Sequence, residues 1–216
     1  MDKVMHIEDG HACEKAAKSL KMGSIIGVPT DTIYGIAALA QSNKAVESIY
    51  QIKERHREKP IAICVADIQD IYRWCEVTVS LSILDDLLPG PVTLIFKRKP
   101  ELNPDLNPAT ELVGVRIPDH KFIRGIARAC EQPVALTSAN KSAAKSCLQV
   151  KEFEYLWPKL DLVFNGGCLG KTEESRLGST VVDLSIEGQY KIIRDGCALS
   201  SVENILRDKY GLLQRT

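Results

Sequence analysis

The apolar run SIIGV at residues 24–28 ends abruptly in PTDTIYG at residues 29–35. A short apolar run of this kind, closed by a proline, is typical of a buried β-strand. A basic cluster follows at residues 53–59. Fixed cations in a cleft stabilise charge that water would otherwise screen. Hydroxyl groups at the strand end facing that cluster would therefore form a site for an anion.

Composition limits the classes of protein to which this chain can belong. Its 216 residues are 44% hydrophobic, which is enough for a full core, and we expect one domain over residues 1–216. Lys and Arg number 28, as do Asp and Glu, so no global field attracts nucleic acid or an anionic membrane. No apolar run approaches the roughly 18 residues of a membrane span, and the early acidic residues argue against a secretory signal.

The seven cysteines indicate the compartment. They contain no C-x-x-C pair, which argues against a disulfide framework and against a zinc site. We expect the thiols, Cys64 and Cys168 included, to be small packing groups in a reducing compartment. The four histidines show no H-E-x-x-H spacing, so we expect no metal held by the protein itself. The expected location is the cytoplasm, with a mitochondrial form as the alternative.

Apolar periodicity predicts helices and strands that are interleaved along the chain. The expected helices span residues 12–20, 45–52, 68–72, 81–88, 122–130 and 198–210, with a weaker helical segment at 153–156. The expected strands span residues 24–28, 61–65, 92–96, 112–117, 133–137, 160–164, 180–184 and 190–193. Asn43 is expected to cap the second helix, with Lys53 and Arg57 one turn apart at its other end. Cations there also suit the helix dipole, which leaves a purely structural role open.

Strands interleaved with helices argue for an α/β fold, a single domain with a twisted, mixed, open sheet flanked by helices. In such sheets the binding crevice lies outside the strand ends. Polar and cationic side chains fall at such ends in several separate segments: Thr30, Thr32, Arg116, Ser138, Asn140 and Arg194. We expect these segments to converge on one site.

Standard phosphate loops and nucleophile motifs are missing from the sequence. Residues 170–172 read GKT, but Asn165 stands where a P-loop needs a glycine. The S-x-x-K pattern at residues 142–145 lies in a polar loop, and neither G-x-S-x-G nor G-x-G-x-x-G occurs. The residues alone therefore indicate a site for a nucleotide or another phosphate ligand, without identifying the reaction.

Six short motifs occur in order along nearly the whole chain. They are PTDTIYG at 29–35, KER at 53–55, LPGPVT at 88–93, RIPDH at 116–120, TSAN at 137–140 and GSTVVD at 178–183. Each motif is weak alone, but the ordered set resembles the YrdC/Sua5 family, and within it the animal members with a YrdC domain. Longer members carry an additional C-terminal domain, which we do not expect here.

The resemblance implies threonylcarbamoyladenylate synthesis, in which L-threonine, bicarbonate and ATP give threonylcarbamoyl-AMP and pyrophosphate. This reaction is the first step toward N6-threonylcarbamoyladenosine in tRNA. The resemblance also implies Mg²⁺ carried by ATP, a concave and positively lined cleft, and transfer of the product to a tRNA threonylcarbamoyl transferase complex. It implies no stable binding of nucleic acid.

The family's site residues map onto this sequence by its motifs. The catalytic residues would be Lys53, Arg55, Ser138 and Asn140. The ATP-binding residues would be Lys53, Arg55, Arg57, Asn140, Ser146 and Arg194. The threonine-binding residues would be Thr30, Thr32, Lys59, Arg116, Ser138 and Ser179. Glu54 stands where the family usually has glycine, which makes the backbone there less free, and Asp195 stands where proline is common.

Two alternatives share the same cations. In the first, the cluster at 53–59 and residues 97–99 form a phosphate-tracking stripe of an RNA-binding module, although the zero net charge weighs against it. The second is a transferase that uses carbamoyl phosphate, which would release orthophosphate and not pyrophosphate.

Overall fold

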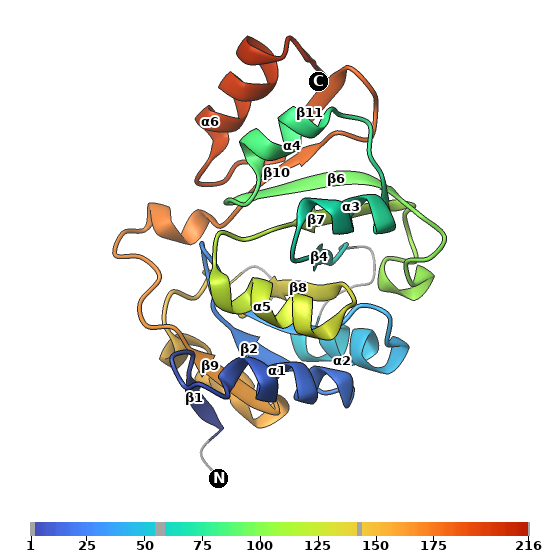
Figure 1. The fold of residues 1–216 in the computed structure, drawn as a ribbon. Coiled ribbons are helices and arrows are strands. Elements are labelled where there is room, and N and C mark those ends of the chain that lie inside the picture. Colours follow the sequence, from blue (N-terminus) through green and yellow to red (C-terminus); the bar gives the residue numbers. More distant parts are fainter. Residues whose placement is uncertain (1–2, 55–58, 142–143, 216) are drawn as a thin grey trace.

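The computed structural model describes residues 3–54, 59–141 and 144–215, which form a mixed α/β fold around one sheet (Figure 1). The sheet is 12-stranded in the order β1-β9-β2-β3-β8-β4-β7-β6-β10-β11-β12, and β5 pairs with β6. Its neighbours include parallel pairs such as β4 with β7 and antiparallel pairs such as β3 with β8. The expected mixed sheet with flanking helices is confirmed.

The strands are short, as their bounds show. They are β1 (Val4–His6), β2 (Ile26–Val28), β3 (Gly35–Leu39), β4 (Ala62–Cys64), β5 (Cys75–Glu76), β6 (Val92–Arg98), β7 (Leu112–Arg116), β8 (Val134–Ser138), β9 (Leu162–Asn165), β10 (Thr180–Asp183), β11 (Gln189–Arg194) and β12 (Leu213–Gln214). Every strand predicted from apolar periodicity is present within a few residues of its expected bounds. Four further strands, β1, β3, β5 and β12, were not predicted.

The helices also follow the predicted pattern. They are α1 (Ala12–Lys21), α2 (Asn43–Lys53), α3 (Ile68–Trp74), α4 (Leu81–Leu87), α5 (Lys121–Cys130) and α6 (Leu199–Glu203). Three 3₁₀ segments are η1 (Pro104–Leu106), η2 (Val150–Lys159) and η3 (Glu174–Leu177), and a π-helical segment, η4 (Asn204–Lys209), follows α6. The weak helical signal at 153–156 falls within η2, a 3₁₀ segment interrupted at Phe153, where the backbone is not helical.

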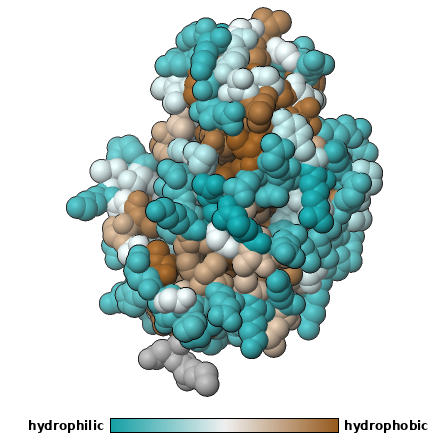
Figure 2. Space-filling model, in the orientation of Figure 1, coloured by the Kyte–Doolittle hydropathy of each residue, from teal (hydrophilic) through white to brown (hydrophobic). Residues whose placement is uncertain are grey.

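Two groups of helices cover the sheet. Helices α1 and α5 lie next to each other and bury an apolar stripe, which includes Leu20 and Ile126, against β2, β8 and β9 (Figure 1). Helix α2 and η2 belong to the larger core cluster, together with α3, α4 and α6, which gather around β6 and β10 at the other end of the sheet. Figure 2 shows a mostly hydrophilic surface, with hydrophobic residues gathered below the top of the molecule. These layers leave the strands of the middle of the sheet fixed from both sides.

The start of α2 corrects one expectation. Ser42, not Asn43, is the N-cap, because its side chain accepts a hydrogen bond from the Ala45 amide at 3.3 Å. The Asn43 amide instead donates to Asp105 at 2.7 Å and ties α2 to η1. A serine one residue earlier supplies the same acceptor, so the capping chemistry was predicted but not its position.

The end of α2 lies where the basic cluster begins. The helix ends at Lys53, and Glu54 is its C-cap in the left-handed region with φ 49°. Glycine is the residue that this conformation favours, which gives a physical reason for the glycine that the family usually has there. The predicted position of Arg57, one turn beyond Lys53, lies outside the described residues.

Candidate active site

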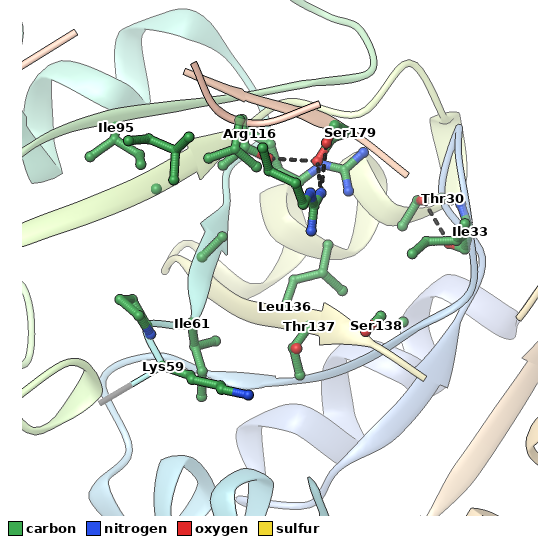
Figure 3. Close-up of a pocket in the computed structure, with 18 of the residues that line it drawn as sticks. Thr30, Ile33, Lys59, Ile61, Ile95, Arg116, Leu136, Thr137, Ser138 and Ser179 are labelled. Carbon is green, nitrogen blue, oxygen red and sulfur yellow. Dashed lines mark hydrogen bonds between the residues drawn. The ribbon is translucent and has the colours of Figure 1, made fainter. Parts of the chain in front are cut away.

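One cleft is lined by a single face of the sheet (Figure 3). Its volume is about 660 Å³. The lining residues alternate along two strands, Thr93 and Ile95 of β6 and Gly114 and Arg116 of β7. At the end of β8 three successive residues, Leu136, Thr137 and Ser138, line the cleft. Successive side chains of a strand point to opposite faces, so this alternation means that one face of the sheet curves around the cavity. The lining also draws on β3, β4, β10 and β11, which are neighbours of these strands in the sheet.

The charge of the cleft favours an anion. Its lining contains Lys59, Arg116 and Arg194, and no Asp or Glu is among the described residues that line it. Hydroxyl groups of Thr30 and Ser179 stand beside these cations. A concave site with cations, hydroxyls and low-dielectric walls focuses field lines onto a negatively charged ligand. This arrangement supports the anion site that the sequence predicted.

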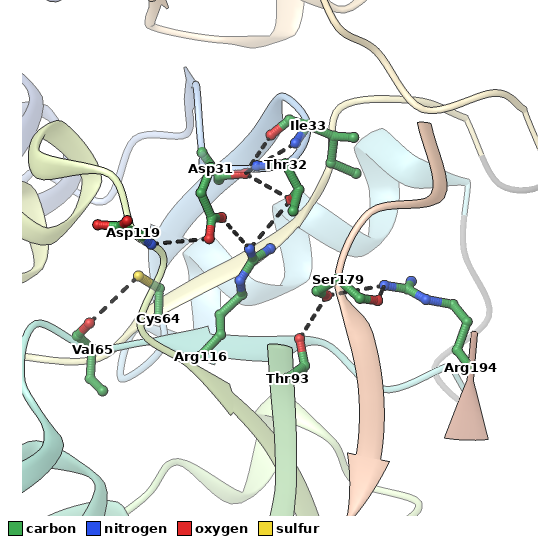
Figure 4. Close-up of polar contacts among 11 residues, drawn as sticks. Asp31, Thr32, Ile33, Cys64, Val65, Thr93, Arg116, Asp119, Ser179 and Arg194 are labelled. Carbon is green, nitrogen blue, oxygen red and sulfur yellow. Dashed lines mark hydrogen bonds and ion pairs between the residues drawn. The ribbon is translucent and has the colours of Figure 1, made fainter. Parts of the chain in front are cut away.

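Arg116 is held in place by a carboxylate behind it. Its Nη2 lies 2.7 Å from Oδ1 of Asp31 and donates a hydrogen bond to Thr32 Oγ1 at 3.3 Å (Figure 4). Both charged side chains are 8% exposed. Asp31 also accepts the backbone N–H of Asp119 at 3.0 Å. Nε of Arg116 is buried and has no hydrogen-bond partner among the described residues, so part of the guanidinium is left for a ligand.

The segment between β2 and β3 is fixed by Thr30. Its hydroxyl donates to the carbonyl of Ile33 at 2.7 Å and accepts the backbone N–H groups of Thr32 and Ile33, both at 3.2 Å. Thr30 and Thr32 are also 3.2 Å apart between their hydroxyl oxygens. Thr30 lines the cleft, whereas Thr32 reaches it through Arg116. A threonine that satisfies two amides of its own turn makes this loop a rigid wall of the site.

Ser179 lies on the opposite wall with two polar neighbours. Its hydroxyl oxygen is 2.9 Å from Thr93 Oγ1 and accepts a hydrogen bond from Arg194 Nη2 at 3.1 Å. Arg194 also donates to the Ser179 carbonyl at 2.6 Å. The close approach of the chain here requires Gly196, because a Cβ at that position would lie 2.3 Å from the Thr180 nitrogen. The described contacts therefore bring Ser179 and Arg194 together on one wall of the cleft, and their roles in threonine and ATP binding stay predictions.

Lys53 lies behind the cleft and not in it. It is 2% exposed, and its Nζ donates to the Ser138 carbonyl at 2.5 Å, to Ser138 Oγ at 3.3 Å and to the Asn140 carbonyl. Ser138 lines the cleft, while Asn140 is buried and donates to the Lys141 and Ala144 carbonyls at 3.0 and 2.6 Å. Oδ1 of Asn140 has no hydrogen-bond partner among the described residues. Lys53 thus shapes the exit of β8, which carries the S-x-N motif.

The remaining site residues fall in three different places. Lys59 lines the cleft. Ser146 is not among the residues that line it, and its carbonyl accepts a hydrogen bond from Arg176 at 2.6 Å. Arg55 and Arg57 lie outside the described residues, so their predicted roles stay predictions. No group of three or more His, Cys, Asp or Glu residues that could hold a metal occurs in the described part of the chain.

The cysteines only partly match expectation. Cys64 is buried, and desolvation raises the pKa of its thiol to about 12. Cys168 is exposed, so the prediction that it is a packing group is wrong. It follows β9 in a loop, where its Sγ lies 2.9 Å from the Gly170 carbonyl. An isolated cysteine in a loop carries no periodicity from which its exposure could have been read.

Sequence reasoning missed two residues that shape the site. Asp31 lies inside the PTDTIYG motif, and a buried cation at the end of β7 was a signal that a carboxylate had to be near it. Thr93 lies on the cleft face of β6 together with Ile95. A polar residue in an otherwise apolar run was the signal for it. In both cases the partner became visible only when strands distant in sequence were placed side by side.

Comparison with known proteins places this architecture in a family. A family model named Sua5_yciO_yrdC and described as telomere recombination matches residues 18–196. The chain belongs to the Sua5/YciO/YrdC family. A crystal structure of Sua5 from P. abyssi in complex with L-threonine superposes with a TM-score of 0.81 at 24% identity, covering 94% of this chain and 58% of that protein. That similarity shows that the family fold is shared.

Relatives of this Sua5/YciO/YrdC chain share a name. A Homo sapiens protein named threonylcarbamoyl-AMP synthase is 52% identical over 204 residues, which cover 94% of this chain and 73% of the human protein. A Bacillus subtilis protein of the same name is 29% identical over 176 residues, covering 80% of this chain and 51% of that protein.

Among the described residues, no helix combines the length and apolar character needed to cross a membrane.

Proposed function

We infer that this chain is a threonylcarbamoyl-AMP synthase, a nucleotidyltransferase that makes the adenylate from L-threonine, bicarbonate and ATP. The observation that carries this inference is the convergence of the family's motif residues on one cleft whose described lining has cations and hydroxyls but no carboxylate. The human relative, with 52% identity over 204 residues, bears the name of that activity. The reaction joins two anions, and a cleft of this charge lowers the cost of bringing them together.

The threonine subsite is best supported near Arg116. Its guanidinium donates both of its hydrogen bonds to Asp31 and Thr32 through Nη2, so another edge can receive the substrate carboxylate. Thr30 forms the wall beside Arg116, where its hydroxyl group holds the turn, and Ser179 supplies a hydroxyl group on the opposite wall. A buried polar partner for the substrate hydroxyl can reject valine by ~10⁴-fold, whereas one missing methyl changes the free energy by only ~1–3 kcal/mol. Serine is therefore the amino acid that we expect the enzyme to use in error in place of threonine.

The nucleotide subsite is best supported along the rest of the cleft. The lining becomes apolar through Ile61, Ile95 and Ile193, and continues into an adjoining cavity of about 250 Å³ lined by Pro60 and Leu112. An apolar pocket of this kind suits a flat base. Arg194, which lines the cleft, would face the phosphates of ATP, and ATP would bring its Mg²⁺ with it. Lys59 also lines the cleft and remains a proposed contributor to the threonine subsite. Arg55, Arg57 and Ser146 remain proposed contributors to the nucleotide subsite.

The chemistry needs no nucleophile from the protein. The threonine amine takes up carbon dioxide or bicarbonate, and an oxygen of the resulting carbamate attacks the α-phosphorus of ATP. The bond from that phosphorus to the bridging oxygen breaks, and pyrophosphate leaves. Lysine and arginine side chains fixed before the reaction stabilise the charge that spreads over the phosphoryl oxygens.

We also propose the destination of the product. Threonylcarbamoyl-AMP is an activated acyl donor, so a tRNA threonylcarbamoyl transferase complex would consume it, giving the t6A nucleoside of tRNA. The proposed compartment is the cytoplasm. Stable binding of RNA by this chain is disfavoured because its basic residues are engaged in the fold: Lys53 is buried, and Arg98 and Lys99 donate to the carbonyls of Pro104 and Tyr72.

The decisive experiment follows the product. The purified chain is incubated with ATP, labelled bicarbonate and each amino acid in turn, and labelled adenylate and released phosphate are measured. We expect a threonine-dependent adenylate with stoichiometric pyrophosphate. A parallel incubation in which carbamoyl phosphate replaces bicarbonate tests the other transferase, since orthophosphate released from it without an adenylate would identify a carbamoyl-phosphate transferase. Salt-sensitive tRNA binding without adenylate formation would identify an RNA-binding module.

A further inference from the structure

The hydroxyl groups of Thr93 and Ser179 carry two hydrogens, and the hydrogen bond between them uses only one. The two hydroxyl oxygens are 2.9 Å apart, so one hydroxyl donates to the other. The guanidinium of Arg194 carries N–H donors and no acceptor atom, so it must be the donor in its 3.1 Å hydrogen bond with Ser179 Oγ. No other acceptor for the second hydroxyl hydrogen is found among the described residues, and both side chains line the cleft. One O–H of the pair is therefore available to a ligand.

Arg194 determines which hydroxyl points into the cleft. A guanidinium that donates to Ser179 Oγ draws electron density from that oxygen and makes its O–H the stronger donor. Either hydroxyl of the pair could be the donor, and both arrangements contain the same number of hydrogen bonds. An anionic acceptor in the cleft is bound best by the stronger donor, which favours the arrangement in which Arg194 and Thr93 both donate to Ser179 and the Ser179 hydrogen faces the cleft. Thr93 is 6% and Ser179 4% exposed, so water cannot easily replace either contact.

The rotamer of Thr93 is fixed by a glycine on the next strand. Gly114 lies opposite Ile95 in the register of β6 with β7, and a Cβ at Gly114 would lie 2.9 Å from Cγ2 of Thr93. The methyl group thus occupies the space that the glycine leaves, and the hydroxyl is turned toward Ser179. Thr93 is also paired in register with Val181 of β10, which holds its backbone on that side.

We propose that Thr93 is a positioning residue which donates to Ser179 and so directs the Ser179 hydroxyl at an oxygen of the substrate. This proposal rests on the proposed function, in which threonine lies at that wall of the cleft. The acceptor is an anionic oxygen of the bound amino acid, its carboxylate or the carbamate formed from its amine. Thr93 itself does not touch the substrate.

The test compares Thr93→Val, Thr93→Ser and Ser179→Ala in steady-state assays of adenylate formation. Thr93→Val keeps both branches of the side chain and loses only the donor, so we expect kcat/KM for threonine to fall about 10-fold, with the KM for ATP unchanged. Thr93→Ser restores the donor and is expected within about twofold of wild type. Ser179→Ala is expected to lose about 10- to 100-fold, and adding Thr93→Val to it should cost nothing further.

A matched control lies in the segment between β5 and α4. Thr78 donates its hydroxyl to the Leu184 carbonyl and is not among the residues that line the cleft. Thr78→Val should lower the unfolding midpoint without changing either KM. Equal kinetics of Thr93→Val and wild type, losses that multiply in the double variant, or a Thr93→Ser variant as impaired as Thr93→Val would each overturn the proposal. A wild-type chain that forms no threonine-dependent adenylate would instead overturn the function on which the proposal rests.

Discussion

Lys53 and Arg116 are two buried cations of the same site, but different groups hold them. Arg116 is paired with the Asp31 carboxylate at 2.7 Å, and both side chains are 8% exposed. Lys53 donates to the carbonyls of Ser138 and Asn140, at the end of β8. Arg116 is held by an opposite charge, whereas Lys53 is held by main-chain carbonyls and orders that stretch of backbone. The two sides of the site should therefore fail in different ways.

The difference follows from what each cation leaves behind when it is removed. Without Arg116, the Asp31 carboxylate keeps the Asp119 amide but loses the charge that compensates its burial. Without Lys53, two main-chain carbonyls lose a donor in a region that water scarcely reaches. A buried uncompensated charge costs more free energy than a buried carbonyl without a partner. Stability should thus separate the two sides more clearly than activity does.

The largest expected effect is that of Arg116→Met. Breaking one partner of a buried ion pair typically lowers the free energy of unfolding by ~3–5 kcal/mol. Urea unfolding monitored by circular dichroism measures this loss. The double variant Asp31→Asn with Arg116→Met removes the leftover charge and should regain most of the stability, although it stays inactive. A double variant no more stable than Arg116→Met would show that the pair is not what stabilises this side.

Lys53→Met should have the next largest effect. Each of the two carbonyls left without a donor costs ~1–3 kcal/mol, and the lower half of that range applies because Ser138 is only half-buried. We therefore expect a loss of about 2–4 kcal/mol together with a fall in turnover of ~10²–10³-fold. The same urea titration and the pyrophosphate assay measure both. Lys53→Arg is the informative companion, because it keeps the charge but cannot fit the same carbonyls. Full stability of Lys53→Met would contradict the role assigned to those two bonds.

The comparison also shows how far the sequence could lead. The convergence of Ser138, Arg194 and Arg116 on one hollow followed from the rule that polar residues at strand ends share one edge of a sheet. The burial of Lys53 did not follow, since a lysine at a helix end is normally solvated. It is buried because α2 packs across the exit of β8, a contact that periodicity cannot reveal.

The missed strands have a similar explanation. Strand β3 reads GIAAL and is buried throughout, between β2 and β8. Its small residues have low intrinsic preference for strands, and only pairing on both sides makes it one. Strands β1, β5 and β12 are two or three residues long, too short for any alternation to register. The local sequence pattern predicts strands that bury branched side chains. It misses strands that form only because neighbouring strands pair with them.

The buried thiols of Cys64 and Cys147 report separately on local opening at the Arg116 side and the Lys53 side of the site. Cys64 is paired in register with Arg116, and Cys147 donates through Sγ to the Ala139 carbonyl beside Ser138 and Asn140. Burial raises the pKa of Cys64 to about 12 and that of Cys147 to about 11. Because the thiolate is the reactive form, both should resist alkylation at pH 8 until the surrounding structure opens.

We expect the two variants to expose different thiols. Arg116→Met should speed alkylation of Cys64 at least 10-fold more than that of Cys147, and Lys53→Met should do the reverse, as read by peptide mass spectrometry. The pH dependence has a fixed sign: raised pKa values in the folded state mean stability that is complete below about pH 9 and is lost as pH rises toward 11 and 12. Equal acceleration of both thiols in both variants would mean that the two sides open as one unit.

The smallest expected effect is that of Glu54→Gly, at the C-cap that follows Lys53. Glu54 has φ 49°, and glycine there relieves ~1–2 kcal/mol of backbone strain but gains entropy in the unfolded chain and loses the exposed ion pair with Lys141. We expect a net gain of about 0.5 kcal/mol in urea unfolding, with turnover unchanged. Glu131→Gly, at the matching C-cap of α5 with φ 56°, controls for the helix end alone. If Glu131→Gly stabilises and Glu54→Gly lowers turnover, the strained cap is itself needed to hold Lys53 against the carbonyls of β8.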